Sequence, residues 1–300
     1  MQLSVVVPTL DGREQLARTL DALAAHVPAA EVVVVNGPST DGTTGMVRER
    51  DDVDVLVEVA DRTVTAARNA GIERTTGDVV ALVDQGLAVT DEWHDALVEG
   101  LADADVVSGP VHERLRGGMT TEQVESDALA GRAITYVNGG NVAFSRPALD
   151  ALDGFDEYLE IGSARDGAHR LANLDYAVTW NAEMGVAREV GADGGGPTSD
   201  PGWKYRSLAY RLVKNYGVRP RVAARMVVHA GRDALDSLRD VARGDGTPSN
   251  WLGTGRDVLS GLAVGVKDGL WARLLDRSDR RNPYGRSARS DRAVAVYDRR

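Results

Sequence analysis

The first hundred residues alternate between short runs of aliphatic side chains and longer segments with helical spacing. Runs such as 32–35 and 79–83 contain no polar residue, which is typical of strands buried on both faces of a sheet. They predict strands at 3–7, 32–35, 53–59 and 79–83. Because helical segments separate these strands, we expect a parallel sheet with helices on both faces.

Apolar spacing and capping residues predict the helices between the strands. Leucines four and three residues apart begin at Leu16, after the first strand. A helix over about 62–76 is expected to end at Gly77 as a C-terminal cap. Thr90 is placed as the N-cap of a further helix, which buries Trp93.

Polar and loop-forming residues follow the predicted strands. In a parallel sheet the ligand site lies outside the carboxyl ends of the strands, and here these ends carry Pro8 and Thr9, Asn36, and Asp84. The layout is typical of a nucleotide site, although no G-x-G-x-x-G dinucleotide motif accompanies it. A second glycine cluster, 191–196, precedes a proline and is interpreted as a linker or mobile loop.

Composition excludes several classes of protein. A chain of 300 residues with 43% hydrophobic side chains fits one large globular domain or two small ones and excludes disorder. The absence of cysteine excludes disulfides and cysteine-built metal sites. The longest uncharged stretch, 133–145, is shorter than the roughly 20 residues of a membrane-spanning helix. We also expect no export signal and a cytoplasmic location.

The chain is acidic, with 45 acidic and 35 basic side chains and a formal net charge of −10. Only three of the basic residues are lysine. Exposed carboxylates hold hydration in concentrated salt, where their mutual repulsion is screened. The composition therefore favours a halophilic source, with a GC-rich genome as the alternative explanation.

Positive charge is concentrated near the end of the chain, since residues 203–300 carry 21 basic and 10 acidic side chains. Five arginines lie in one narrow sector of a predicted helix, opposite valines and leucines. They are Arg221, Arg225, Arg232, Arg239 and Arg243. Aromatic and basic residues also mix over 203–216, a composition suited to lipid headgroups. We expect contact with an anionic membrane, or alternatively pairing of these arginines with the acidic part of the chain.

Two further expectations concern this basic region. Residues 277–300 are expected to form an extended surface tail. Nucleic acid is not an expected partner, because no helix-turn-helix, zinc-finger or RNA-binding motif accompanies the positive charge and the whole chain is acidic.

Six short motifs occur in a fixed order along the chain. They are VVVPT at 5–9, VVNGPSTDGT at 34–43, ARNAG at 67–71, GDVVALVD at 77–84, GGNVA at 139–143 and GFDE at 154–157. In this order they resemble family 2 glycosyltransferases, over about residues 1–190. With the acidic composition, the chain is similar to haloarchaeal members that extend lipid-linked glycans for protein N-glycosylation.

The resemblance implies a GT-A fold, which is a Rossmann-like, mostly parallel α/β sheet with flanking helices. It implies a catalytic domain over 1–200 that binds a nucleotide-sugar donor and a lipid-linked or glycan acceptor, such as a dolichol phosphate-linked glycan, and inverts the sugar on transfer. A basic, mainly helical region over 201–300 follows. A non-catalytic homologue that binds nucleotide, glycan or a partner enzyme is the alternative.

The resemblance also assigns roles on the donor side. Pro8 and Thr9 belong to the donor-binding motif, and Asn36 stands where the family has a base-recognising aspartate. Asp41 either binds the nucleotide or caps the next helix. The remaining two donor residues concern the diphosphate: Arg68 approaches it, and Asp84 matches the first acid of an Asp-X-Asp motif that holds Mg²⁺ or Mn²⁺. Gln85-Gly86 supplies no second acid, which leaves the metal assignment open, with Asp91 as a distant reserve ligand.

The acceptor side follows in the same way. An inverting transferase needs a base for the acceptor hydroxyl, and Asp166 matches the aspartate of the family's Glu-Asp motif, with Arg165 replacing the glutamate. The motif at Gly139, Gly140 and Asn141 is expected to let the backbone approach sugar and acceptor. The nearby His169 and Arg170 are candidate acceptor contacts.

Overall fold

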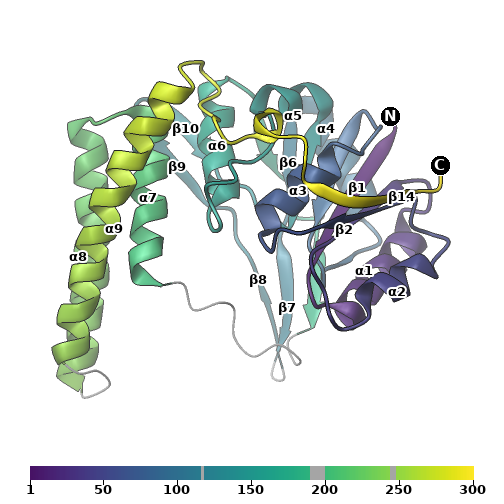
Figure 1. The fold of residues 1–300 in the computed structure, drawn as a ribbon, viewed down its shortest axis with the longest axis horizontal. Helices are drawn as coiled ribbons and strands as arrows, with labels where there is room; N and C mark the ends of the chain where they lie inside the picture. The colour runs from purple at the N-terminus through teal and green to yellow at the C-terminus, as the bar shows by residue number, and fades with distance from the viewer. Residues whose placement is uncertain (116–117, 190–199, 244–247) are drawn as a thin grey trace. The chain divides into compact units, whose positions relative to one another are not determined.

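The computed structural model describes residues 1–115, 118–189, 200–243 and 248–300. The chain forms two compact units, which we describe separately (Figure 1). The first contains Met1–Asp127, Ala133–Asp193 and Tyr284–Arg300, and the second contains Ala128–Arg132 and Gly194–Pro283. The glycine cluster at 191–196 lies outside the described residues.

An eight-stranded sheet organises the first unit, in the order β12-β6-β11-β4-β1-β2-β3-β14. Strands β4, β1, β2 and β3 are parallel neighbours, which confirms the four predicted strands. The strands are β1 (Leu3–Thr9), β2 (Glu31–Asn36), β3 (Val55–Val59), β4 (Val79–Val83), β6 (Val106–Ser108), β11 (Asn141–Ser145), β12 (Val178–Trp180) and β14 (Ala293–Asp298).

Helices cover both faces of this sheet, as the continuous aliphatic runs predict. Along β1, Val5 and Val7 face one apolar cluster and Val6 faces the other. Helices α1 and α4 contribute to the first cluster, and α3, α5 and α6 to the second. Their bounds are α1 (Arg13–His26), α2 (Thr43–Arg48), α3 (Val64–Ile72), α4 (Trp93–Asp103), α5 (Arg146–Leu152) and α6 (Ser163–Asn173).

Two predicted helix ends differ in the structure. Helix α3 stops at Ile72, and Gly77 is not its cap. A Cβ at Gly77 would lie 2.6 Å from the carbonyl oxygen of Gln2, so this glycine allows close backbone approach beside β1. The N-cap position of α4 is Glu92, not Thr90, although Trp93 is buried as expected.

Smaller sheets complete the first half of the chain. Strands β5 (Ala88–Val89), β13 (Val186–Glu189), β7 (Val111–Leu115) and β8 (Gly118–Thr121) form a four-stranded sheet in that order. Strands β9 (Ser126–Leu129) and β10 (Arg132–Thr135) pair with each other.

The end of the chain differs from the extended surface tail expected over 277–300. After the short 3₁₀ helix η1 (Arg286–Ala288), residues 293–298 form β14, which pairs antiparallel with β3 at the edge of the large sheet (Figure 1). Backbone pairing with a distant strand is invisible to local sequence patterns, and it joins Tyr284–Arg300 to the first unit.

Three helices form most of the second unit, namely α7 (Pro201–Tyr216), α8 (Pro220–Arg243) and α9 (Pro248–Leu275). Helix α9 presents glycine every four residues to α7, and a Cβ at Gly261 or Gly265 would lie 2.1 or 2.3 Å from a carbonyl oxygen of α7. Glycine therefore permits this close helix packing. Within the part of the chain that the structure describes, no helix is long and apolar enough to span a membrane.

Candidate nucleotide-sugar site

A pocket of about 230 Å³ lies at the carboxyl ends of the central strands. Pro8, Thr9 and Asp84 line it, so the structure brings together three residues predicted for the donor side. The register explains this meeting, because β1 pairs with β4 and both strands end at the same edge of the sheet.

The pocket also has lining residues that the sequence prediction missed. Asp61, Arg62 and Thr63 follow the end of β3, and Gly37 follows β2. Because these residues follow the carboxyl ends of parallel strands, the rule that ligand sites lie at those ends could have identified them from the sequence. Arg188 reaches the pocket from β13, and only the tertiary structure places that strand.

The pocket's acid, Asp84, is paired with Arg68 of α3. Nη2 of Arg68 donates to both carboxylate oxygens of Asp84, at 2.8 and 2.9 Å. Only 6% of the Arg68 side chain is exposed, against 30% for Asp84. The guanidinium is thus held beside the pocket with an accessible carboxylate in front of it.

Gly139 and Gly140 lie against this pair. A Cβ at Gly140 would be 2.7 Å from Oδ2 of Asp84, and one at Gly139 would be 3.0 Å from Nη1 of Arg68. Side chains at either position would displace the charged pair, so glycine is required here.

Gln85 occupies the position after Asp84 and ties two strand ends together. Its Oε1 accepts hydrogen bonds from the Thr9 hydroxyl, at 2.5 Å, and from the Leu10 amide, at 2.9 Å. Its Nε2 donates to the Leu10 carbonyl at 3.3 Å. The residue in place of a second acid therefore fixes the loop after β1.

Asp84 is the candidate metal ligand of the pocket. Among the described residues there is no cluster of three or more His, Asp or Glu side chains that could hold an ion. The reserve ligand Asp91 instead pairs with His26, at 3.2 Å. Asp84 alone fits a cation such as Mg²⁺, which commonly takes one or two carboxylates and completes its shell with water and substrate phosphates.

Two predicted donor residues organise loops around the pocket. Asn36 is fully buried, donates to the Thr44 hydroxyl at 2.8 Å and accepts from the Ser39 hydroxyl at 2.7 Å. Asp41 accepts from the backbone amides of Arg13 and Thr43, at 2.9 and 3.1 Å. These contacts join Asp41 to the beginnings of α1 and α2, and the N-cap position of α2 is Gly42.

Asp166 is placed differently from an acceptor-side base. Its side chain has no exposed surface, and it accepts from Nε of the equally buried Arg170 at 2.8 Å. Arg170 also donates to the carbonyl oxygens of Leu152 and Gly154. Asp166 and Arg170 thus form a buried ion pair four residues apart on α6 that anchors the end of α5.

Asn141 and His169, two further predicted acceptor residues, are buried. Asn141 accepts from the Trp93 indole at 2.8 Å and donates to the Met184 carbonyl at 2.6 Å. His169 is buried in an edge-to-face contact with Tyr136, with ring centroids 5.6 Å apart. Sequence motifs thus located the region and overestimated how many of its side chains face outward.

Glu122 is an exposed carboxylate connected to the glycine pair. It accepts from the Asn138 side-chain amide at 2.5 Å. Asn138 in turn accepts from the Gly140 amide at 2.9 Å, and Gly140 adjoins Asp84. Nothing in the local sequence marks Glu122, because the end of β8 reaches this point only through tertiary structure.

Comparison with known families agrees with this geometry. Residues 4–148, which contain the pocket's strand ends and the glycine pair, match the family described as Glycosyl transferase family 2. Over these residues the chain is similar to members of this family.

Two relatives within the family come from Haloferax volcanii. Glycosyltransferase AglE is 29% identical over 134 residues, which are 41% of this chain and 44% of AglE. A glucosyl-dolichyl phosphate glucuronosyltransferase is 32% identical over 120 residues, covering 37% of this chain and 38% of that protein. The resemblance to haloarchaeal members is confirmed, and the matches span less than half the length of each relative.

Solved glycosyltransferase structures share the fold. The mannosyltransferase PcManGT from Pyrobaculum calidifontis, in complex with GDP-Man and Mn²⁺, has a TM-score of 0.57 at 18% identity over 92% of this chain and 88% of its own. TarS 1–349 from S. aureus, in complex with UDP-GlcNAc, has a TM-score of 0.64 at 16% identity over 95% and 89%. The GT-A fold predicted from the sequence is confirmed.

Proposed function

We propose that this protein transfers a sugar from a nucleotide-sugar donor to an acceptor hydroxyl, with inversion at the anomeric carbon. The observation that carries the proposal is the Arg68–Asp84 pair beside a pocket at the carboxyl ends of the strands. The family match supports the reaction class, and the nucleotide-sugar complexes of PcManGT and TarS support the donor class.

The donor's diphosphate gains negative charge as the bond to the sugar breaks. Arg68 adjoins the pocket, and Arg62 and Arg188 line it, so guanidinium groups are available to stabilise that charge. Asp84 would hold Mg²⁺ or Mn²⁺ together with the phosphates, and this cation would offset further charge on the leaving group. Pro8 and Thr9 would form the wall of the donor site at the end of β1.

On the acceptor side we assign the base to Glu122. Its exposed carboxylate is connected through Asn138 to the glycine pair beside Asp84, whereas Asp166 is enclosed. Glu122 would accept the proton of the attacking hydroxyl as the new glycosidic bond forms and the nucleoside diphosphate leaves.

The acceptor class that we propose is a lipid-linked saccharide, dolichol phosphate-linked in the setting of N-glycosylation. One haloarchaeal relative is named as acting on a glucosyl-dolichyl phosphate. The acidic, lysine-poor composition supports a halophilic source. A lipid-linked acceptor would place the enzyme at a membrane surface, for which we propose the cytoplasmic face.

Helix α8 supports peripheral membrane contact. Val227, Leu235 and Leu238 share one side of the helix and are 68%, 55% and 47% exposed. The basic row was expected opposite this side, but helical spacing puts Arg232 and Arg239 beside Leu235. Of its described members, Arg221, Arg232 and Arg239 are exposed and Arg225 is partly buried. An apolar stripe beside a basic stripe suits the interface of an anionic bilayer. The side chains of Val241 and Arg243, which extend the two rows in the sequence, lie outside the described ones.

A nucleotide-binding homologue without transferase activity is the second candidate. The enclosed position of Asp166 favours it, because the family's expected base is not accessible. Its test is whether Glu122 is needed for turnover.

Donor binding and turnover can be measured separately. Calorimetry with UDP and GDP, each with Mn²⁺ or with EDTA, tests the pocket and its cation; we expect one nucleotide to bind and EDTA to weaken it. Release of nucleoside diphosphate from UDP-GlcNAc or GDP-Man, with membrane lipid extract as acceptor source, then tests transfer. Binding without turnover on any donor and acceptor would favour the non-catalytic homologue, and no binding of either nucleotide would contradict both candidates.

A further inference from the structure

The last residues of the chain return to the edge of the sheet that carries the pocket. Strand β14 runs antiparallel to β3, so Ala293 at its beginning lies opposite Val59 at the end of β3. The pocket residues Asp61, Arg62 and Thr63 follow immediately after Val59. Residues 284–293 therefore approach the pocket loop, although more than two hundred positions separate them in the sequence.

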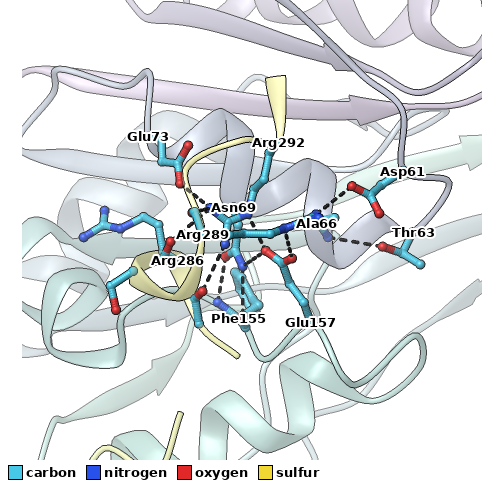
Figure 2. Close-up of polar contacts among 12 residues, drawn as sticks. Asp61, Thr63, Ala66, Asn69, Glu73, Phe155, Glu157, Arg286, Arg289 and Arg292 are labelled. Atoms are coloured by element: carbon cyan, nitrogen blue, oxygen red, sulfur yellow. Dashed lines mark hydrogen bonds and ion pairs between the residues drawn. The ribbon is translucent and has the colours of Figure 1, made fainter. Parts of the chain in front are cut away.

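Arg289 of this segment binds the pocket loop directly. Its Nη2 donates to Oδ2 of Asp61 at 2.6 Å, and its Nε donates to Oε2 of Glu157 at 3.0 Å (Figure 2). The Asp61 carboxylate is thus fixed by a group outside the family-matching residues 4–148. Charge-assisted hydrogen bonds of this kind define orientation as well as adding energy.

Arg292 holds the same segment in place from the interior. It has no exposed side-chain surface and pairs with Glu73 and Glu157 (Figure 2). It also donates to the carbonyl oxygen of Gly285 at 3.0 Å, which closes the segment on itself. Because the buried Arg292 guanidinium has several acceptors, it holds the segment that carries Arg289 in a fixed position.

The same hydrogen-bond network reaches α3, the helix that carries Arg68. Oε1 of Glu157 accepts from the Asn69 side-chain amide at 2.7 Å. The Asn69 side chain also donates to the Phe155 carbonyl at 2.9 Å and accepts from the Phe155 backbone amide at 2.8 Å. Asn69 is the neighbour of Arg68 on α3. The C-terminal segment therefore contacts Asp61 directly and is connected to Asn69 through Glu157.

We propose that Arg289 is a positioning residue for the donor pocket and acts through Asp61. Asp61 faces the bound nucleotide sugar, where a carboxylate accepts from hydroxyl or amide donors of the nucleoside. Arg289 restrains that carboxylate to one orientation before the donor arrives, so binding does not have to order it. This inference rests on the proposed donor site and adds the C-terminal segment to it.

The test compares full-length variants by calorimetry with whichever of UDP and GDP the wild type binds. We expect Arg289→Ala to weaken nucleotide binding about tenfold, of the order found when a polar group that positions a ligand contact is lost. Arg289→Lys should recover part of the affinity, because an ammonium restores the charge without the two-pronged geometry. The double variant Asp61→Asn with Arg289→Ala should bind nucleotide no more weakly than Asp61→Asn alone, because both substitutions act through the same Asp61 contact.

Arg286→Ala is the matched control. Arg286 belongs to the same segment and pairs with Asp150 at 2.8 Å, and Asp150 does not line the pocket. Thermal unfolding of both variants reports any general loosening of the segment, and we expect only Arg289→Ala to change nucleotide affinity. Equal losses in the two variants, or unchanged affinity in Arg289→Ala, would overturn the inference. Failure of the wild type to bind either nucleotide would instead overturn the proposed donor site itself.

Discussion

Nη2 of Arg68 lies within hydrogen-bond distance of both carboxylate oxygens of Asp84, on a wall that Gly139 and Gly140 leave free of side chains. The pair joins α3 to the end of β4 in the pocket. Removal of either charge leaves the other without its partner. Substitutions at these two positions should therefore have larger effects than substitutions of ordinary surface residues.

Arg68→Gln should weaken binding of UDP or GDP by about one to two orders of magnitude, because a charge-assisted contact to phosphate contributes roughly 1.5–3 kcal/mol. Calorimetry with Mn²⁺ measures the change. Arg18→Gln, on the outer side of α1, serves as a control for loss of a positive charge. A variant at position 68 with wild-type affinity would remove Arg68 from the donor site.

Asp166→Asn should destabilise the fold before it affects chemistry. Removing one partner of a buried ion pair typically costs about 3–5 kcal/mol, since Arg170 would remain charged and enclosed. Chemical denaturation gives the free energy of unfolding. Replacing both residues together, as in Asp166→Leu with Arg170→Met, should recover much of the loss. A stable Asp166→Asn protein without turnover would instead support a catalytic role.

Glu122→Gln should reduce kcat by roughly 10²–10⁴-fold with little change in nucleotide affinity, the range expected when a general base is lost. Steady-state assays at several pH values provide the measurement, and the acidic limb of the rate profile should disappear with the carboxylate. Glu14→Gln, exposed on α1, is the control. Retention of wild-type kcat in Glu122→Gln would exclude this residue as the base.

Exposed leucines of α8 should determine binding to anionic vesicles. Leu235→Asp with Leu238→Asp is expected to abolish co-flotation with phosphatidylglycerol vesicles at the working salt concentration, since both substitutions place charge in the apolar stripe. Val294→Asp, at a residue of β14 that is 70% exposed, tests an apolar position in the first unit. Wild-type protein that stays in the soluble fraction would contradict membrane docking.

His229 should make the second unit sensitive to mild acid. Burial, together with Arg225 and Arg232, lowers the pKa of His229, while Asp233 acts in the opposite direction. The unfolded state then binds a proton at higher pH than the folded state does, so stability should fall as pH drops below about 6.5. His229→Gln should reduce the change in the thermal unfolding midpoint between pH 7 and 5.5. His94→Gln, at an exposed position on α4, should leave that change as it is in the wild type.

Much of the architecture follows from local chemistry in the sequence. Continuous valine runs such as 32–35 have no polar face, and this alone requires a strand covered on both sides. Pro8, Thr9 and Asp84 were placed correctly because the carboxyl ends of parallel strands share one edge. The glycine pair at 139–140 was recognised from its motif, and the register of β11 against β4 explains it.

The sequence did not determine which polar side chains face the pocket. Asp166 and Arg170 have the same spacing whether they project outward or inward, and only the packing of α6 encloses them. Glu122, Arg188 and Arg289 reach the site from distant parts of the chain through strand pairing and ion pairs. Periodicity records which residues are apolar along one element, whereas the direction of a polar side chain depends on the neighbours that the tertiary fold supplies.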